Sequence, residues 1–368
     1  MKITCTQENL YQGILQVQGI AVQASPLPIL KNIFLEAKKG VLKLKSTNLE
    51  IGITTSIRGK IDEEGQITAD ARLLSSFISL LSQEKVNITT DGKNLIIETS
   101  VHKTQINGLA ADEFPVIPEV KKENEFKISA QEFKQSLLEV SPASSTDDTR
   151  PEINGVYCNI ADKIITFAGT DSYRLAEKKL ELLDGKQGKE AFIIPLRTIK
   201  ELIRTITNDN EIISLYKGDN QVLFTYGETE MVTRLIEGEY PNYTQIIPTA
   251  YNYTFTIGKE DFINAIKISG LFASIGSNSV TLTLCPSKKE LIIFSETNFG
   301  EERTTLSVDI EGKEDVRIVF DYRYLLDGLT SILCDEVVFC ATSESSPSVL
   351  KPKDSAKQFL YIVMPIRQ

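Results

Sequence analysis

Short strands of alternating hydrophobic and polar residues, each followed by a helix-like segment, recur three times along the chain. Residues 2–4, 127–129 and 254–256 each precede a segment with two apolar residues four positions apart. The pairs are Leu10 with Ile14, Phe133 with Leu137, and Phe262 with Ile266. This spacing places both side chains on one helical face, so each segment predicts a strand that leads into an amphipathic helix.

A second pattern recurs at nearly the same interval. A strand with apolar residues at every other position ends in a Thr followed by Asn or Asp at Thr47, Thr170 and Thr297, which are 123 and 127 residues apart. Alternation followed by such a polar pair is typical of a half-buried strand that runs into a turn.

Further strand-then-helix signals lie near residues 66–74, 192–200 and 317–325, and Pro115, Pro241 and Pro365 close the three copies. We therefore predict three repeats of one α+β domain, each with two helices packed on antiparallel sheets of about eight strands in all. The predicted domains span residues 1–122, 126–248 and 253–368.

Composition narrows the chemistry. The 368-residue chain has 40 Lys and Arg against 50 Asp and Glu, a net charge of −10, which disfavours nucleic acid over the whole surface but allows a local basic lining. No apolar stretch approaches the roughly 20 residues of a membrane span, and the five scattered cysteines predict a reducing cytoplasm. His102 is the single histidine, so we expect no Ser-His-Asp, Cys-His or His-rich metal site, and an enzyme would have to work with carboxylates and lysines alone. The sequence contains neither G-x-x-x-x-G-K-[ST] nor a G-x-G-x-x-G after a strand, and we expect no cofactor.

Three large domains have the option of closing head to tail into a ring, with helices facing a central hole. The segment after Pro195 carries Arg197, Lys200 and Arg204 at i, i+3 and i+7, which lie on one helical face. A single basic residue is usually part of an ordinary solvated face, but this stripe is typical of a lining that touches phosphates without reading bases.

Several short segments, in this order, make the chain resemble the bacterial sliding clamps, the beta subunits of the replicative DNA polymerase III holoenzyme. The segments are residues 27–30, 47–52, 111–115, 170–176, 237–243 and 361–367. The resemblance implies a ring-forming DNA clamp fold in a head-to-tail homodimer that encircles duplex DNA. It also implies an ATP-driven clamp loader, replicative and repair polymerases as partners, and no catalysis.

The resemblance also implies a peptide-binding groove between the second and third domains. The matching positions are Ile153, Thr170, Ser172, Tyr173, Arg174, Leu175, Pro241, Ile246, Ile362, Met364, Pro365, Ile366 and Arg367. Apolar side chains with the polar edges Thr170, Arg174 and Arg367 suit a short peptide with a Gln and two large apolar residues. Alternation alone also allows Ile362 and Met364 to be core residues of a last strand. Two departures from the family are Ser172-Tyr173 at the groove rim and Gln368 at the end of the chain.

For DNA contact we predict a delocalised basic set. It comprises Arg72, Lys134, Arg150, Arg197, Lys200 and Arg204. For the dimer interface we predict Ile106 on an edge strand and Ile268 in a helix. Two other hypotheses stay open: a metal-dependent nuclease built on Asp147, Asp148 and Asp171, and a scaffold that never surrounds DNA.

Overall fold

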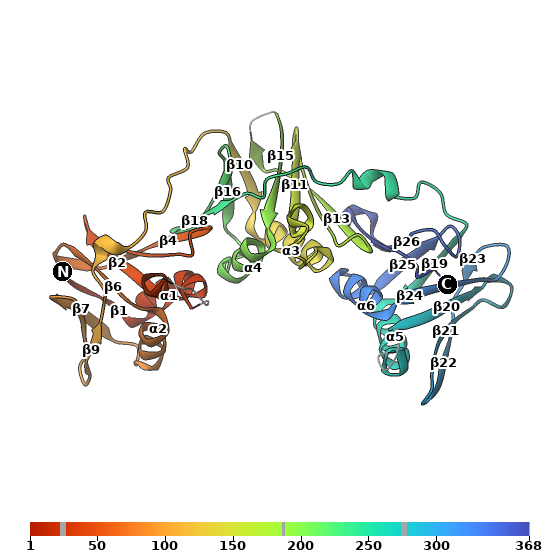
Figure 1. Cartoon of the computed structure of the whole chain (residues 1–368), viewed down its shortest axis with the longest axis horizontal. Helices are drawn as coiled ribbons and strands as arrows, with labels where there is room; N and C mark the ends of the chain where they lie inside the picture. Colours follow the sequence, from red (N-terminus) through yellow and green to blue (C-terminus); the bar gives the residue numbers. More distant parts are fainter. Residues whose placement is uncertain (23–26, 186–187, 274–277, 368) are drawn as a thin grey trace. The chain divides into compact units, whose positions relative to one another are not determined.

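The computed structural model describes residues 1–22, 27–185, 188–273 and 278–367. These ranges hold strands β1 to β27 and helices α1 to α6. A strand, a helix, five strands, a second helix and three strands follow one another in each third of the chain. Figure 1 colours these elements along the sequence, from red at the N-terminus to blue at the C-terminus. The α+β class and the threefold repeat predicted from the sequence are confirmed, with nine strands in each repeat instead of about eight.

The bounds of the elements are as follows. The first repeat contains β1 (Lys2–Thr6), α1 (Gln7–Ala21), β2 (Asn32–Lys38), β3 (Val41–Thr47), β4 (Ile51–Arg58), β5 (Lys60–Glu63), β6 (Gly65–Asp70), α2 (Ala71–Leu80), β7 (Lys85–Asp91), β8 (Asn94–Glu98) and β9 (Lys103–Asn107). The second contains β10 (Glu125–Ser129), α3 (Ala130–Val140), β11 (Gly155–Ala161), β12 (Ile164–Thr170), β13 (Arg174–Glu181), β14 (Asp184–Gly185), β15 (Lys189–Pro195), α4 (Leu196–Thr205), β16 (Ile212–Lys217), β17 (Gln221–Tyr226) and β18 (Thr229–Arg234). The third contains β19 (Tyr253–Gly258), α5 (Lys259–Ala273), β20 (Ser279–Cys285), β21 (Glu290–Thr297), β22 (Gly300–Ser307), β23 (Ile310–Glu311), β24 (Val316–Asp321), α6 (Tyr322–Ser331), β25 (Glu336–Ala341), β26 (Ser348–Pro352) and β27 (Phe359–Val363).

By internal packing the chain forms two compact units. Unit 1 comprises Met1–Phe133, Leu182–Lys186 and Lys200–Leu235. Unit 2 comprises Lys134–Glu181, Gln187–Ile199 and Ile236–Gln368. The second repeat therefore contributes strands to both units.

In unit 1, helix α1 packs on α2 and covers one face of β2, β3 and β4. Its apolar pair, Leu10 and Ile14, is fully buried, as the sequence predicts. A Cβ atom on Gly13 would lie 2.7 Å from Ile57 Cγ2 and 2.9 Å from Leu44 Cδ1. Because close-packed cores leave no such space, α1 can lie this near the sheet only with glycine at that position.

One nine-stranded sheet joins the first two repeats within unit 1. Its strand order is β14-β10-β16-β17-β18-β4-β3-β2-β6, and a second sheet has the order β5-β1-β7-β8-β9. Strand β18 pairs antiparallel with β4, from Thr229 opposite Thr55 to Thr233 opposite Ile51. The hydroxyl groups of Thr55 and Thr229 lie 2.9 Å apart across this junction.

Unit 2 repeats this construction. Its nine-stranded sheet has the order β15-β11-β12-β13-β27-β26-β25-β19-β23, and α5 packs against α6 and the sheet β22-β21-β20-β24. Strand β27 pairs antiparallel with β13, from Phe359 opposite Lys178 to Val363 opposite Arg174. In both units the ninth strand of one repeat thus pairs with the first five residues of the fourth strand of the preceding repeat.

Candidate functional site

The turn between β12 and β13 is held by two side chains of its own. The Thr170 hydroxyl donates to the Arg174 carbonyl (2.6 Å) and accepts from the Ser172 amide (3.1 Å). Asp171 Oδ1 accepts from the amides of Tyr173 (2.9 Å) and Arg174 (3.0 Å). Ser172 adopts a φ of 80°, in the left-handed region that favours glycine. The Thr-Asp pair noted in the sequence therefore shapes a tight turn that leaves the Tyr173 side chain exposed.

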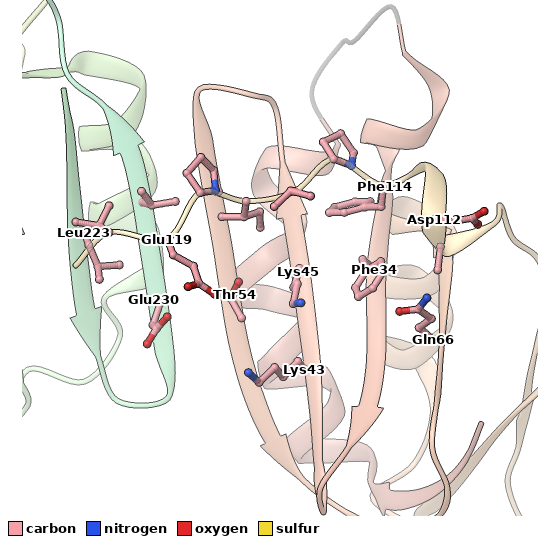
Figure 2. A pocket seen from close by; sticks show the side chains of 18 of the residues that line it. Phe34, Lys43, Lys45, Thr54, Gln66, Asp112, Phe114, Glu119, Leu223 and Glu230 are labelled. Carbon is pink, nitrogen blue, oxygen red and sulfur yellow. The ribbon is translucent and has the colours of Figure 1, made fainter. Parts of the chain in front are cut away.

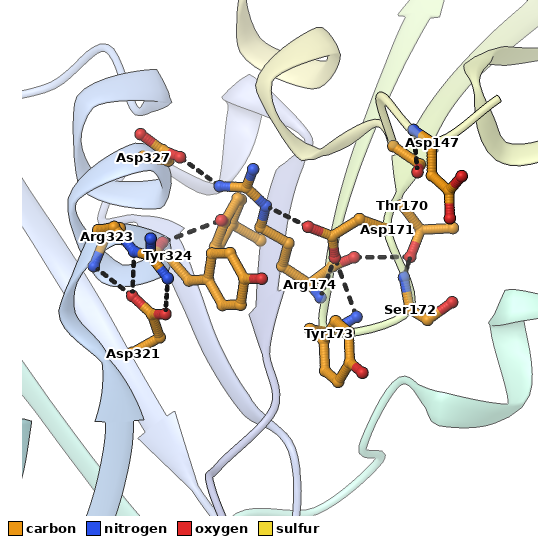
Figure 3. Close-up of polar contacts among 12 residues, drawn as sticks. Asp147, Thr170, Asp171, Ser172, Tyr173, Arg174, Asp321, Arg323, Tyr324 and Asp327 are labelled. Carbon is orange, nitrogen blue, oxygen red and sulfur yellow. Dashed lines mark hydrogen bonds and ion pairs between the residues drawn. The ribbon is translucent and has the colours of Figure 1, made fainter. Parts of the chain in front are cut away.

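Arg174 connects this turn to helix α6 (Figure 3). Its Nε donates to Asp171 Oδ2 at 2.9 Å, and its Nη1 forms an ion pair with Asp327. The guanidinium carbon lies 4.5 Å from the ring centroid of Tyr324, which in turn stacks with Tyr173 at 6.4 Å. Burial acts to lower the pKa of Arg174, but the Tyr361 hydroxyl, Asp327 and Asp171 together raise it. The arginine therefore stays charged, and its orientation is fixed from three sides.

The predicted groove residues divide into a buried floor and an exposed rim. The floor comprises Ile153, Thr170, Leu175 and Ile362, each less than 9% exposed. Met364 and Pro365 are half-buried. The rim comprises Ser172, Tyr173, Pro241, Ile246, Ile366 and Arg367. Gln368 lies outside the described residues.

Backbone pairing brings the two halves of the predicted groove together. Leu175 lies opposite Ile362, and the Met364 amide donates to the Tyr173 carbonyl at 2.8 Å. Tyr243, between Pro241 and Ile246 in sequence, is buried in one cluster with Leu175 and Ile362. Four of the positions inferred from the resemblance are thus neighbours in unit 2: Tyr173, Leu175, Ile362 and Met364. The floor itself is almost closed to solvent.

The predicted basic residues have unlike surroundings. Arg72, Arg197 and Lys200 are exposed, and Lys134 is half-buried. Arg204 donates to the backbone carbonyls of Leu15 (2.5 Å) and Gln16 (2.9 Å) in α1 and pairs with Glu201 (2.8 Å). Arg150 donates to Ser172 Oγ at 2.7 Å and pairs with Glu152 at 3.4 Å. Arg204 and Arg150 therefore hold other parts of the protein, a role that charge patterning in the sequence does not reveal.

The two predicted interface residues differ in exposure. Ile106 is 2% exposed on β9, a terminal strand of its sheet, whereas Ile268 is 48% exposed on α5. The Ile106 side chain therefore packs inside its own domain, and the part of β9 open to another chain is its backbone edge.

The carboxylates of the nuclease hypothesis serve local turns. Asp147 Oδ1 accepts from the Thr149 amide (2.9 Å) and hydroxyl (2.8 Å), which lower the pKa of Asp147. Asp148 accepts from Asn154 at 2.8 Å, and Asp171 holds the turn described above. In the ranges that the structure covers, no three His, Cys, Asp or Glu side chains form a group that could hold a metal ion.

Three family descriptions together cover most of the chain. Residues 1–118 match the N-terminal domain of the DNA polymerase III beta subunit, residues 127–242 its central domain, and residues 244–367 its C-terminal domain. The chain belongs to this family. It is 30% identical to the beta sliding clamp of Synechococcus elongatus over 100% of this chain and 99% of that protein. It is 31% identical to the beta sliding clamp of Staphylococcus epidermidis over 93% of this chain and 92% of that protein.

Solved structures of sliding clamps have the same fold. The DNA polymerase sliding clamp of Bacillus subtilis matches with a TM-score of 0.94 at 25% identity, covering 100% of this chain and 99% of that one. The beta subunit from Thermotoga maritima matches with a TM-score of 0.93 at 24% identity, over 100% and 99% of the two chains. A clamp from Pseudomonas aeruginosa bound to griselimycin matches with a TM-score of 0.94 at 23% identity, over the full length of both chains. The sliding clamp resemblance seen in the sequence is confirmed.

None of the helices in the described ranges combines the length and apolarity needed to span a membrane.

Sequence reasoning missed the partners of Arg174. Asp327 and Tyr324 lie on one face of α6, more than 140 residues from Arg174. Their spacing of three residues shows that they share a helical face but gives no sign of what that face meets. The Tyr243 hydroxyl, which donates to Glu177 at 2.6 Å, was missed for the same reason.

Proposed function

We propose that this chain is a DNA polymerase processivity factor that acts as a head-to-tail homodimeric ring around duplex DNA. The ring is loaded by a clamp loader in the cytoplasm. It tethers replicative and repair polymerases through the groove between the second and third predicted domains, and it acts by enclosure and not by catalysis. Such tethering raises the effective concentration of polymerase at DNA without tight binding to DNA.

The observation that carries the proposal is the repeated sheet junction. The fourth strands β4 and β13 each pair with a ninth strand, β18 or β27. One ninth strand, β9, and one fourth strand, β22, remain at the ends of their sheets. The same pairing between β9 of one copy and β22 of the next continues the construction from chain to chain, and a closed ring leaves neither edge open.

The internal junctions also specify a register for this contact. Thr304 takes the place of Thr55, since each lies opposite a fully buried residue of the neighbouring strand, Ile293 or Leu44. Thr104 takes the place of Thr229, because each lies two residues before a buried Ile106 or Met231. As Thr229 lies opposite Thr55, we expect Thr104 to lie opposite Thr304 of the partner copy.

Cysteine cross-linking tests this register. The variant T104C/T304C should form a covalent dimer under mild oxidation, and the single variants T104C and T304C should not. If the cysteine at position 104 cross-links only to a cysteine at position 302 or 306, the true register differs from the predicted one by two residues. Absence of a cross-link at all three positions would reject the edge pairing.

Retention on DNA tests the enclosure. After loading, the protein should remain on a circular duplex and slide off a linear duplex of the same sequence within minutes. Equal loss from both substrates would reject topological binding. A dimer that forms but is not retained on circles would favour a scaffold that does not surround DNA.

The arrangement around Arg174 supports the peptide groove. The fixed, charged guanidinium provides a polar anchor, and the exposed side chains of Tyr173, Ile246 and Ile366 in the same unit provide apolar surface for a peptide. The P. aeruginosa clamp bound to griselimycin is a precedent for a bound ligand on this fold. Arg174→Ala should weaken binding of a partner peptide at least tenfold while the dimer persists. Unchanged affinity would place the groove elsewhere.

A further inference from the structure

A solvent-accessible cavity of about 600 Å³ lies in unit 1, within the size range of ligand pockets. Its floor is the face of β2, β3, β4, β17 and β18 formed by Phe34, Lys43, Lys45, Leu223 and Val232 (Figure 2). Its cover is the connection between the first two repeats, residues 111–122. The cavity lies at the β4–β18 junction and is separate from the predicted groove of unit 2.

The cover is anchored at three points. The ring centroids of Phe114 and Phe34 lie 5.2 Å apart. Ile117 and Val120 pack on the cluster of Tyr216, Leu223 and Val232. Lys122 then pairs with Glu230 at 2.8 Å, beyond the last apolar anchor. An extended segment of the chain therefore already binds this sheet face through apolar side chains at every third position.

The equivalent face in unit 2 is filled by more rings. Tyr157 of β11 corresponds to Phe34 of β2, and it contacts two tyrosines of the next connection: Tyr240 stacks on it at 4.8 Å and Tyr243 meets it edge-on at 6.4 Å. In unit 1 Phe114 takes the place of Tyr240, and the smaller Ile117 follows it where Tyr243 follows Tyr240. The cavity in unit 1 therefore lies where unit 2 has an additional ring.

The two faces also differ in charge. Lys43 and Lys45 lie two residues apart on the floor of the cavity, where unit 2 has Thr166 and Ala168. Lys45 is neutralised by Glu36 at 3.0 Å and lies 5.0 Å from the Phe34 ring centroid. Lys43 is exposed and lies opposite Glu36 on β2, but among the described residues it forms no ion pair of its own, since the close pair of Glu36 is with Lys45. The acidic residues Asp112, Glu119 and Glu230 also line the cavity, and Glu230 is the one paired with Lys122.

We propose that this cavity is a second docking site, for an extended peptide segment of a protein partner in which an aromatic residue lies two positions from an acidic one. The aromatic ring takes the space beside Phe34 and Phe114, and the carboxylate pairs with Lys43. In an extended chain residues i and i+2 point to the same side, so both side chains reach the same sheet face.

Methyl NMR of the full-length protein with an acetylated and amidated Asp-Gly-Phe peptide tests the site. Millimolar peptide should shift the methyl signals of Ile117 and Val232 in unit 1 and leave Ile362 and Ile366 in unit 2 unchanged. Asp-Gly-Ala and Lys-Gly-Phe peptides should bind at least fivefold more weakly. Equal shifts with all three peptides, or no shift at Ile117, would overturn the proposal.

Two variants give independent controls. Ile117→Tyr supplies the missing ring from the chain itself and should reduce binding at least fivefold. Lys43→Glu should reverse the preference between the Asp-Gly-Phe and Lys-Gly-Phe peptides, while Lys38→Glu, at the exposed end of β2, should not. If Ile117→Tyr fails to fold, the charge reversal still decides, and an unchanged preference in Lys43→Glu would reject the pairing. A peptide that binds the predicted groove of unit 2 should shift the methyl signal of Ile366 in all these variants. Loss of that shift would count against the groove, and loss of the shift at Ile117 would count against the cavity.

Discussion

The turns that lead into β4 and β13 have the same backbone but different side chains. In the first turn the Thr47 hydroxyl donates to the Ile51 carbonyl and Asn48 Oδ1 accepts from the amides of Glu50 and Ile51. Thr170 and Asp171 make the same bonds in the second turn. The residues in left-handed conformation also correspond, with φ of 77° at Leu49 and 80° at Ser172.

The difference is in the second polar atom of the Asn or Asp side chain. Asp171 uses Oδ2 to bind Arg174, whereas Asn48 Nδ2 is buried without a hydrogen-bond partner in the described structure. Ile51, in the place of Arg174, is 1% exposed. The two turns therefore share their backbone conformation. The pair Asp171 and Arg174 makes the second turn a charged site, whereas Asn48 and Ile51 make the first turn part of the hydrophobic core.

Moving the arginine to the first turn should have the largest effect. Ile51→Arg buries a guanidinium at a position that is 1% exposed, and Glu201, which takes the place of Asp327 in α4, is already paired with Arg204. The substitution should therefore lower the free energy of unfolding by about 3–5 kcal/mol. Urea unfolding of the full chain measures this loss. A loss below about 1 kcal/mol would show that the turn itself, and not Asp327 and Tyr324, makes an arginine tolerable.

Removing the arginine from the second turn should cost less. Arg174→Ala leaves Asp171 and Asp327 unpaired, but Asp327 is partly solvated, so we expect a loss of about 2 kcal/mol. Asp327→Asn is the matched control, since it keeps the side-chain shape and removes one charge. A larger loss for Asp327→Asn than for Arg174→Ala would contradict this assignment of the charges.

Exchanging the acceptor in the first turn should have a smaller, pH-dependent effect. Asn48→Asp keeps the bonds to the two amides but buries an unpaired carboxylate oxygen, which should cost about 1–2 kcal/mol at pH 7. The cost should shrink as pH falls, because protonation removes the charge. The difference in unfolding midpoint between Asn48→Asp and the unsubstituted protein, measured at pH 7 and pH 5, follows this trend. A difference that grows on acidification would contradict the prediction.

The smallest effect should come from relieving the backbone. Ser172→Gly removes the penalty for a left-handed residue that carries a side chain, partly offset by the greater freedom of glycine when unfolded, for a net gain of about 0.5 kcal/mol. Leu49→Gly tests the same conformation in the first turn. A thermal midpoint that falls in Ser172→Gly would mean that its hydroxyl, bonded to Arg150, matters more than the strain.

These turns show how far the sequence alone could lead. The Thr-Asn and Thr-Asp pairs predict the turns because the interactions are local, and alternation predicts the buried faces. The third copy shows the limit: its turn closes with Thr297 opposite Gly300, two residues tighter than Thr47 opposite Gly52. Counting back from Thr297 as Leu42 and Leu44 are counted back from Thr47 gives Ile292 and Phe294 as the buried pair. Because the turn is shorter, Leu291 and Ile293 are the fully buried residues of that strand instead.

Long-range pairing was beyond the same reasoning. Nothing local to Arg174 specifies Asp327. Ile106 was expected at the dimer interface, but its side chain is buried within its own sheet, and position on an edge strand does not reveal this. The identity of the groove residues came from family resemblance, since the floor residues Leu175 and Ile362 have the same pattern as ordinary core. Sequence periodicity reports which face is buried but not what that face packs against.

Arg204 has a consequence for the affinity of the proposed ring for DNA. Each phosphate that a protein neutralises on duplex DNA steepens the fall of log K with log salt by about 0.9. A guanidinium already bound to two α1 carbonyls and Glu201 has few donors left for a phosphate. The salt dependence of binding to open linear duplex should therefore be shallower than the six predicted basic residues would give, and Arg204→Gln should leave that slope unchanged. If the slope of log K against log salt decreases by about one in this variant, Arg204 contacts a phosphate of the DNA.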